Sequence, residues 1–372
     1  MNDYENVVDF LTPAQRDQLA QTEAEHQRVV TLMQARADGW RGELTDYLSR
    51  TDPKRLEPKA EHMREPVDRV LSRYLEPKGG GKPETISTGF DDLDTLMTLE
   101  PESLVVVGAR SSRGKSCLAL QLAMNVGMFS GYASTFFATE MSSEQMALRA
   151  ACVLASVDSK RIRRGEATEN DRHLLATARG RIAKALSWIS DENGLDVLRV
   201  RERARSDMRR IRDECGKAVK VIVVDYLQRI KAGKAAVGGA NREQQIAAIA
   251  YELKEMAREL KVCVVVPAQL NADGDKRGEG GEARPRASDL RESKSIESEA
   301  DVVLLIHNPH YLEREADPRH DMSKREACEL IVAKGRNDGT GSVPIWFTPM
   351  FTRFSTMTEE DKYERLKRQV PR

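Results

Sequence analysis

The residues with the clearest chemical signature form a short loop that ends in Gly-Lys-Ser. The apolar run 104–107 leads into this loop, and the helix-forming run 117–123 follows it. A strand that breaks into a small-residue loop and continues as a helix is typical of a P-loop, whose backbone N–H groups cradle phosphate oxygens. The predicted phosphate-binding residues are Ala109, Arg110, Ser111, Ser112, Arg113, Gly114, Lys115 and Ser116.

Two side chains at the end of this loop have defined roles in such a site. Lys115 is expected to reach the β- and γ-phosphates, and Ser116 is expected to ligate Mg²⁺. The positive end of the following helix adds to the field at the phosphates. The pattern departs from the strict form at one place, because Ala109 stands where glycine is usual and Gly108 comes one residue early. The sequence still predicts a nucleoside triphosphate site with ATP and Mg²⁺ as cofactors.

The elements that must position this loop alternate between strands and helices from residue 83 onward. This alternation predicts an α/β fold with a mostly parallel central sheet and helices on both faces. A final pair of short runs, 342–347 and 351–355, predicts an antiparallel hairpin at the sheet edge. The other predicted strands are 104–108, 134–139, 219–224, 262–267, 302–307 and 328–333.

Polar residues of suitable type follow three of these strands, at the edge of the sheet where ligands bind. Glu140 could orient and deprotonate an attacking water, Asp225 stands at the Walker B position for Mg²⁺, and Gln269 could sense the γ-phosphate. Any one of them could merely be the polar end of a buried strand. Three in succession behind a P-loop predict a hydrolytic ATPase.

Composition limits the partners and the compartment. The 59 basic and 59 acidic residues give no net charge, so a nucleic-acid partner would have to be met by a local basic surface. The five cysteines show no paired spacing, which predicts buried free thiols in a reducing compartment and no zinc site. No apolar run approaches the roughly 18 residues of a membrane span, so we expect a cytoplasmic protein.

Three regions differ in pattern. Residues 1–82 carry only helical signals, including a helix at 66–76 that three glycines, 79–81, separate from the rest. That helix could pack on its own domain or dock on a neighbouring subunit. Residues 83–357 form the predicted ATPase domain, and 358–372 a charged, mobile tail. The arginine-rich stretch 199–212 is interpreted as a solvated amphipathic helix in preference to a DNA-binding patch.

Several motifs together resemble the DnaB-type replicative helicases. They are Ser87 to Asp94, the P-loop, Glu140-Met141-Ser142, Asp225 to Gln228, Ala268 to Asn271, Ser288 to Glu297, Ala333 to Asn337, Gly339-Thr340-Gly341 and Thr352-Arg353-Phe354. They cover residues 83 to 356 in family order. The resemblance implies a RecA-like ATPase core that assembles as a ring of six, moves 5′ to 3′ along single-stranded DNA and splits forked duplex DNA.

The resemblance also assigns further residues. It implies that Lys334 and Arg336 reach the ATP of the adjacent subunit, and that Gln269 links nucleotide state to a DNA-binding loop. Arg149, on the helix after Glu140, could face the phosphates or could be a solvated helix residue.

DNA contacts are expected from two loops. The first supplies Lys231 and Lys234, and the resemblance places backbone-phosphate contacts of the second at Arg291, Glu292 and Lys294. The family usually has glycine at the position of Lys294, so either a lysine contact or a different loop path is expected there.

Other functions remain open at the level of sequence. A RecA-type recombinase or clock-type ATPase would share the core but is not expected to carry both the Asp-Leu-Arg-Glu-Ser and Lys-x-Arg-Asn motifs. A non-unwinding ATPase that acts as a loader or regulator would keep both. Family members carry a globular collar domain before the core, which residues 1–82 do not resemble, so primase recruitment is not inferred. A helicase loader remains a possible partner, in a bacterial or phage-infected cytoplasm.

Overall fold

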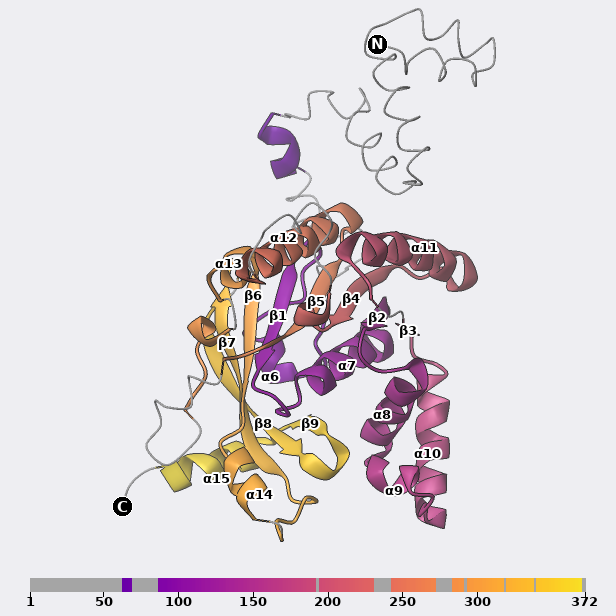
Figure 1. The fold of residues 1–372 in the computed structure, drawn as a ribbon, viewed down its shortest axis with the longest axis vertical. Coiled ribbons are helices and arrows are strands. Elements are labelled where there is room, and N and C mark those ends of the chain that lie inside the picture. The colour runs from indigo at the N-terminus through magenta and orange to yellow at the C-terminus, as the bar shows by residue number, and fades with distance from the viewer. Residues whose placement is uncertain are drawn as a thin grey trace, which may run out of the picture. The chain divides into compact units, whose positions relative to one another are not determined.

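The computed structural model describes residues 62–68, 86–191, 194–230, 242–271, 283–290, 293–317, 319–337 and 339–369 (Figure 1). The chain separates into two compact units, Met1–Pro83 and Glu84–Arg372. In the first unit the described part is 62–68, of which 64–68 is helical. The predicted helix at 66–76 therefore lies, beyond residue 68, outside the described residues.

A nine-stranded sheet forms the centre of the second unit, with the strand order β3-β2-β4-β5-β1-β6-β7-β8-β9. The strands are β1 (Leu104–Ala109), β2 (Ala133–Ala138), β3 (Ser187–Ser190), β4 (Val219–Asp225), β5 (Cys263–Gln269), β6 (Val302–His307), β7 (Glu326–Gly335), β8 (Gly341–Thr348) and β9 (Arg353–Thr356). The strands from β3 to β6 pair in parallel, whereas β7, β8 and β9 pair antiparallel. The mostly parallel sheet and its antiparallel edge hairpin are confirmed.

Helices cover both faces of this sheet, as predicted. The helices are α6 (Asp91–Asp94), α7 (Lys115–Asn125), α8 (Ser143–Ala155), α9 (Ser159–Arg163), α10 (Glu169–Ile182), α11 (Val197–Cys215), α12 (Arg242–Leu260), α13 (Ser293–Glu299), α14 (Tyr311–Ala316) and α15 (Glu359–Gln369). A π-helix, η2 (Val126–Ser130), continues α7.

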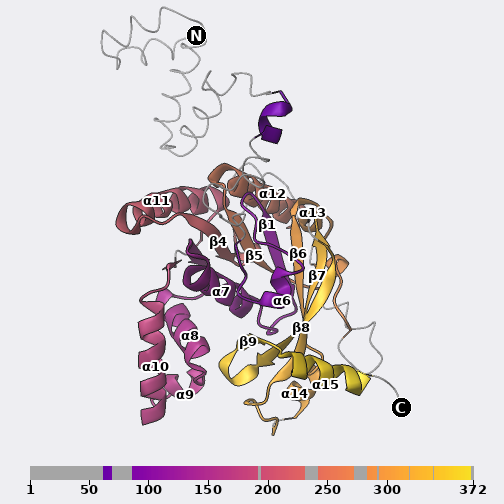
Figure 2. The same cartoon turned by 180° about the vertical axis from the view of Figure 1, so that it is seen from behind.

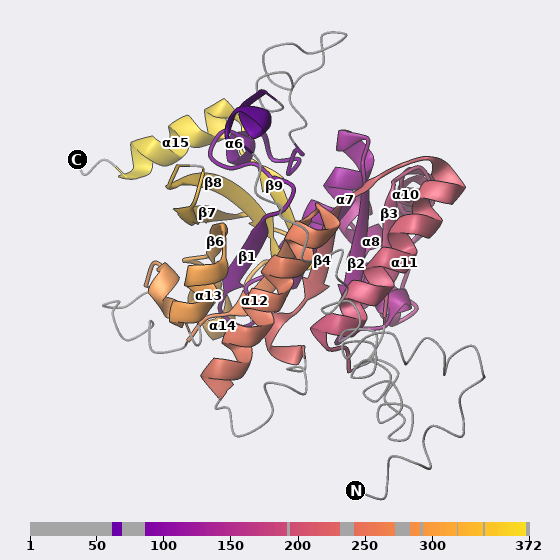
Figure 3. The same cartoon turned by 90° about the horizontal axis from the view of Figure 1, so that it is seen from above.

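Alternating strand residues divide the core into two clusters. On β1, Val105 and Val107 pack with α7 and α8, whereas Leu104 and Val106 pack with α11, α12 and α13. Figure 3 shows these last three helices side by side, and Figure 2 shows α8, α9 and α10 as a separate group. Successive residues of a strand point to opposite faces, so one buried apolar run supplies both clusters.

The arginine-rich stretch forms α11, which confirms the predicted amphipathic helix. Its apolar side chains Val200, Ala204 and Ile211 are buried, and most of its arginines are exposed. The side chain of Asp207 is buried on the same helix and pairs with Arg203 and Arg210.

The tail differs from the mobile segment expected from its charge. Its described residues form α15, which is held to the body of the unit by side-chain contacts. Trp346 Nε1 donates a hydrogen bond to Asp361 Oδ2 over 3.0 Å, and Lys362 Nζ lies 2.8 Å from Asp92 Oδ1. The described residues 359–369 therefore form a helix that contacts the rest of the unit, where the sequence predicted a mobile tail.

No helix in the described part of the chain is long and apolar enough to cross a membrane.

Candidate nucleotide site

The P-loop joins the carboxyl end of β1 to the start of α7. Gly114 stands at the N-cap of α7 with φ of +90°, a conformation that favours glycine, and an added Cβ would lie 3.0 Å from the ring of Phe354. The first turn of α7 has no capping side chain and no acidic residue. The backbone N–H groups of this turn are thus left for an anion, which the helix dipole favours.

Ser116 and Asp225 meet at the centre of the predicted site. The Ser116 hydroxyl donates a hydrogen bond to Asp225 Oδ1 over 2.9 Å. Among the residues that the structure describes, no three or more His, Cys, Asp or Glu side chains are arranged to hold a metal ion. Mg²⁺ at phosphate sites keeps several waters and takes one or two protein oxygens, so a hydroxyl beside one carboxylate fits this ion.

Three more predicted residues, Lys115, Arg149 and Glu140, lie close enough to Asp225 to affect its pKa. Burial raises the pKa of the Asp225 carboxyl, and the hydrogen bond from Ser116 and the positive charges of Lys115 and Arg149 oppose that rise. The negative charge of Glu140 raises the same pKa further. Arg149 thus lies on the side of α8 that faces the site.

Glu140 reaches its place through the pairing of β2 with β4. Ala138 pairs with Asp225, and Thr139 donates two hydrogen bonds to the Asp225 carbonyl, over 3.0 Å from its N–H and 2.7 Å from its hydroxyl. Glu140 follows directly and is exposed. Ser142 caps the next helix, because its side chain accepts a hydrogen bond from the Gln145 N–H.

Gln269 connects the P-loop to the base of the second loop. Its Nε2 lies 3.3 Å from Ser111 Oγ, and the next residue, Leu270, donates its N–H to the Ala109 carbonyl over 3.1 Å. Leu270 also forms an isolated bridge with Leu290. The start of the predicted DNA loop therefore lies directly beside the phosphate loop and pairs with Leu290, the residue before Arg291.

The P-loop residue Arg113 packs on an aromatic ring from a distant part of the chain. Its guanidinium carbon lies 3.1 Å from the ring centroid of Tyr311, and that of Arg314 lies 4.7 Å from the same centroid. Arg314 in turn forms a buried ion pair with Glu326 at 2.6 Å. The start of α14 is thereby fixed against the loop. A tyrosine some 200 residues away in sequence gives no local signal of this contact.

Lys334 and Arg336 lie far from the P-loop of their own subunit. They stand at the end of β7, which runs opposite to β6, and Val302 at the start of β6 pairs with Gly335. Arg336 Nη1 lies 3.3 Å from Asp301 Oδ1, and the other carboxyl oxygen of Asp301 accepts the N–H of Leu104, the first residue of β1. The length of β1, roughly 16 Å at 3.3 Å per residue, separates this point from the P-loop.

The predicted DNA contacts cannot be compared with the structure. Lys231, Lys234, Arg291 and Glu292 lie outside the described residues. Lys294 belongs to the first turn of α13, but the position of its side chain is not described. These assignments stay predictions.

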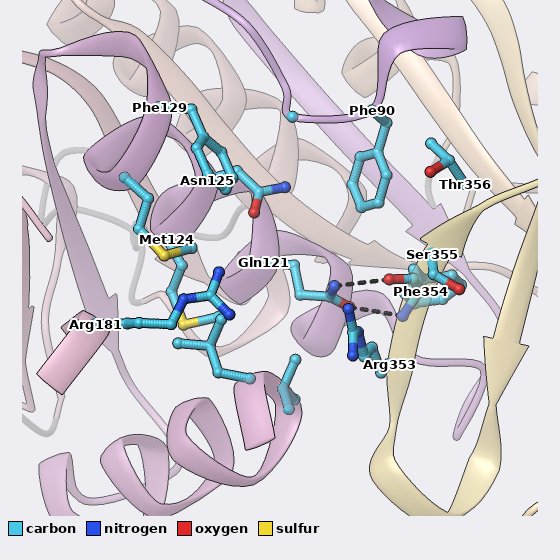
Figure 4. Close-up of a pocket in the computed structure, with 14 residues that line it drawn as sticks. Phe90, Gln121, Met124, Asn125, Phe129, Arg181, Arg353, Phe354, Ser355 and Thr356 are labelled. Carbon is cyan, nitrogen blue, oxygen red and sulfur yellow. Dashed lines mark hydrogen bonds between the residues drawn. The ribbon is translucent and has the colours of Figure 1, made fainter. Parts of the chain in front are cut away.

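A separate hollow of about 200 Å³ lies between α7, α10 and β9 (Figure 4). Arg181 and Arg353 both line it, together with Phe90 and Phe129. Burial and the nearby charge of Arg181 lower the pKa of Arg353, whose Nη1 donates a hydrogen bond to Ser156 over 2.7 Å. This hollow contains none of the residues predicted to bind the nucleotide.

Comparison with known proteins agrees with the geometry. Residues 85–356 match the family model described as DnaB-like helicase C terminal domain. The chain is 36% identical over 281 residues to the replicative DNA helicase DnaB of Haemophilus influenzae, and 34% identical over 273 residues to that of Leifsonia xyli. These alignments cover 75% and 73% of this chain. They cover 56% of each relative, so the chain spans about half the length of the curated relatives it matches.

Solved structures show the same likeness. A solved ATPase domain is covered over 100% of its length and 81% of this chain, with a TM-score of 0.68 and 27% identity. A DnaB-like replicative helicase, solved in a study of its interactions with primase, gives a TM-score of 0.66 and 25% identity. That alignment covers 91% of this chain and 80% of the solved chain. The RecA-like α/β fold is confirmed, and the chain belongs to the DnaB-like helicase C-terminal domain family.

Proposed function

We propose that this chain is the ATP-driven motor of a replicative DNA helicase, which assembles as a ring of six, moves 5′ to 3′ on single-stranded DNA and unwinds forked duplex DNA. Family membership supports the activity, and the helicase names of the curated relatives support the substrate. The same comparisons favour unwinding over a recombinase or a non-unwinding regulator.

The residues at the carboxyl edge of the sheet divide the hydrolytic work. Lys115 and the N–H groups at the start of α7 bind the phosphates, while Ser116 and Asp225 hold Mg²⁺. When bound, this ion neutralises charge on the β- and γ-phosphates. Glu140 orients the attacking water and accepts its proton. The hydrogen bond between Ser116 and Asp225 over 2.9 Å supports this division because it brings the two metal-binding oxygens together.

Lys334 and Arg336 act on the nucleotide of the adjacent subunit. A guanidinium that arrives from a neighbour stabilises charge in the transition state and makes hydrolysis depend on assembly. The side chain of Arg336 is 51% exposed, so part of its guanidinium is available to a neighbour. Its place at the edge of the sheet opposite the P-loop is the single observation that carries the ring proposal.

DNA contacts come from the two loops that follow β4 and β5. Lys231 and Lys234 serve the first loop, and Arg291, Glu292 and Lys294 the second. Such contacts grip phosphates and carry no sequence information. Gln269 couples the loops to the nucleotide, which is supported by its contact with Ser111 and by the closure of the second loop beside Ala109. We place the protein in the cytoplasm, with a helicase loader as a possible partner.

Mixed assemblies test this proposal. Alone, Arg336→Ala subunits should bind ATP and fail to hydrolyse it. Alone, Glu140→Gln subunits should also bind without turnover, because an amide cannot accept the proton of water. Mixed together, the Glu140→Gln subunits supply Arg336 to the intact sites of the Arg336→Ala subunits, so hydrolysis should partly return. Absence of rescue in verified mixed assemblies would show that Arg336 does not act between subunits.

A further inference from the structure

Asp301 is a nearly buried carboxylate at the amino ends of the parallel strands, opposite the P-loop, where it joins three elements. One carboxyl oxygen accepts hydrogen bonds from the Leu104 N–H and from Lys254 Nζ, each over 2.7 Å. The other oxygen lies 3.3 Å from Arg336 Nη1. The side chains of Asp301 and Lys254 are 13% and 15% exposed, so these contacts are largely shielded from solvent.

The backbone of Asp301 takes part in the same arrangement. Its carbonyl accepts the N–H of Arg336 over 2.8 Å, and its own N–H donates to the Leu104 carbonyl over 2.9 Å. Arg336 is thus held at two points by one residue, through its backbone and through its guanidinium. Because two fixed points restrict a long side chain far more than one, Asp301 limits the directions in which Arg336 can extend.

Carbonyls at the C-terminal end of α13 accept hydrogen bonds from both Arg336 and Lys334. Arg336 Nη2 donates a hydrogen bond to the Ser298 carbonyl over 3.2 Å, and Lys334 Nζ donates to the carbonyls of Ser298 and Glu297. Carbonyls at a helix C-terminus carry partial negative charge and favour such cations. Burial and the adjacent charge of Arg336 lower the pKa of Lys334. The carbonyls of Glu297 and Ser298 hold the two cations beside each other despite their repulsion.

We propose that Asp301 is the positioning residue of Arg336 and aims this guanidinium at the nucleotide of the adjacent subunit. The inference rests on the proposed action of Arg336 between subunits. Asp301 contributes nothing directly to the P-loop of its own subunit, because the length of β1 lies between them. Asp301 therefore affects a subunit that donates Arg336 to the nucleotide site of its neighbour. It does not affect the nucleotide site of its own subunit, which accepts an arginine from the other neighbour.

The substitution Asp301→Asn separates the two roles. An asparagine of the same shape can still accept the Leu104 N–H, but it lacks the charge that attracts Arg336 and Lys254. A displacement of about 1 Å at a reacting group can cost roughly 100-fold in rate. The matched control is Asp92→Asn, which removes the charge of Asp92 from its 2.8 Å pair with Lys362 between α6 and α15.

The experiment uses Glu140→Gln subunits as donors of Arg336 and Arg336→Ala subunits as acceptors. Steady-state ATP hydrolysis is measured in verified mixed assemblies. Asp301→Asn added to the donor should lower the rescued rate about 10- to 100-fold. Added to the acceptor, whose own Arg336 is already absent, it should leave the rescued rate unchanged. Asp92→Asn should leave the rate unchanged in either position.

A merely structural role gives a different pattern. If Asp301→Asn lowers the rescued rate equally in both positions, or in neither, Asp301 does not position the arginine and the proposed helicase function stands. If the parent mixture itself shows no rescue, the action of Arg336 between subunits fails, and this inference fails with it. Thermal unfolding of each variant verifies the fold. Should Asp301→Asn unfold, Asp301→Glu, which keeps the charge but lengthens the side chain, replaces it with the same expected asymmetry.

Discussion

Several side chains near the candidate site combine burial with charge, and this combination decides what each can do. Asp225 is buried beside Ser116, Lys115 and Arg149, so a carboxylate that burial would otherwise neutralise is compensated by a hydroxyl and two cations. Arg113 lies against Tyr311, which orders the loop before any nucleotide arrives. A loop ordered in advance pays less conformational entropy on binding.

Removal of the Tyr311 ring should weaken nucleotide binding. A cation–π contact of this kind contributes about 0.5–2 kcal/mol, and 1.4 kcal/mol corresponds to a tenfold change in Kd, so Tyr311→Ala should raise the Kd about 2- to 30-fold. Tyr311→Phe keeps the ring and should bind as the wild type does. Titration with a fluorescent ATP analogue measures both. Equal affinities of the Ala and Phe variants would remove the ring from this role.

The thiols should differ sharply in reactivity. All five cysteines are free; four are buried and Cys215 is exposed, which corrects the expectation that all are buried. Burial raises the pKa of Cys117 to about 11 and that of Cys263 to about 12, so neither forms the reactive thiolate near neutral pH. A thiol reagent at pH 8 should therefore modify Cys215 in a rapid phase, and Cys215→Ser should abolish this rapid phase. A fast phase that survives this substitution would contradict the assignment.

Several site residues could be predicted because their positions follow from chain order. Polar residues at the ends of parallel strands converge on one edge, so Ser116, Asp225 and Gln269 were expected together. The contact of Arg113 with Tyr311 and the place of Asp301 were not predicted. Both depend on how distant strands are ordered and where β7 reverses direction, and a lone Asp before a buried strand resembles any polar strand end.

Long apolar runs in the sequence predicted most of the strands, but the short strand β3 was not predicted. β3 contains only Ser187 to Ser190, with two apolar residues between two serines, and it stands at the end of the strand order, where it pairs with β2. A contact with η2 helps to hold β3 in place. Leu186 donates its N–H to the carbonyl of Gly127 in η2 over 2.9 Å, a contact that local sequence does not reveal.

The close approach of η2 to β3 can be tested at Gly127. A Cβ there would lie 2.1 Å from Ser187 Oγ and 2.8 Å from the Leu186 backbone. Gly127→Ala should therefore lower the free energy of unfolding by about 1–3 kcal/mol. Gly180, within α10, has no atom within 4 Å of a new Cβ, so Gly180→Ala should raise it by about 0.5–1 kcal/mol. Denaturant unfolding measures both variants. A Gly127→Ala variant that is as stable as the wild type would refute the predicted clash.

The groups predicted to act on the nucleotide lie at opposite ends of the parallel strands of one sheet. The P-loop, Asp225 and Glu140 gather at the carboxyl ends of the parallel strands, while Lys334 and Arg336 stand at the other edge. A single copy therefore cannot complete its own site with these two cations. In the proposed ring each subunit faces its neighbour and receives these cations from it, so we expect hydrolysis to depend on assembly.

Strand displacement on a forked duplex distinguishes a helicase from an ATPase that does not unwind DNA. Purified wild-type chain should release the paired strand when ATP and Mg²⁺ are present and the fork carries a 5′ single-stranded tail. Glu140→Gln should bind the same fork without releasing the strand, because it binds ATP but cannot hydrolyse it. ATP hydrolysis that single-stranded DNA stimulates, with no strand released from any fork, would contradict the helicase assignment and favour a non-unwinding ATPase.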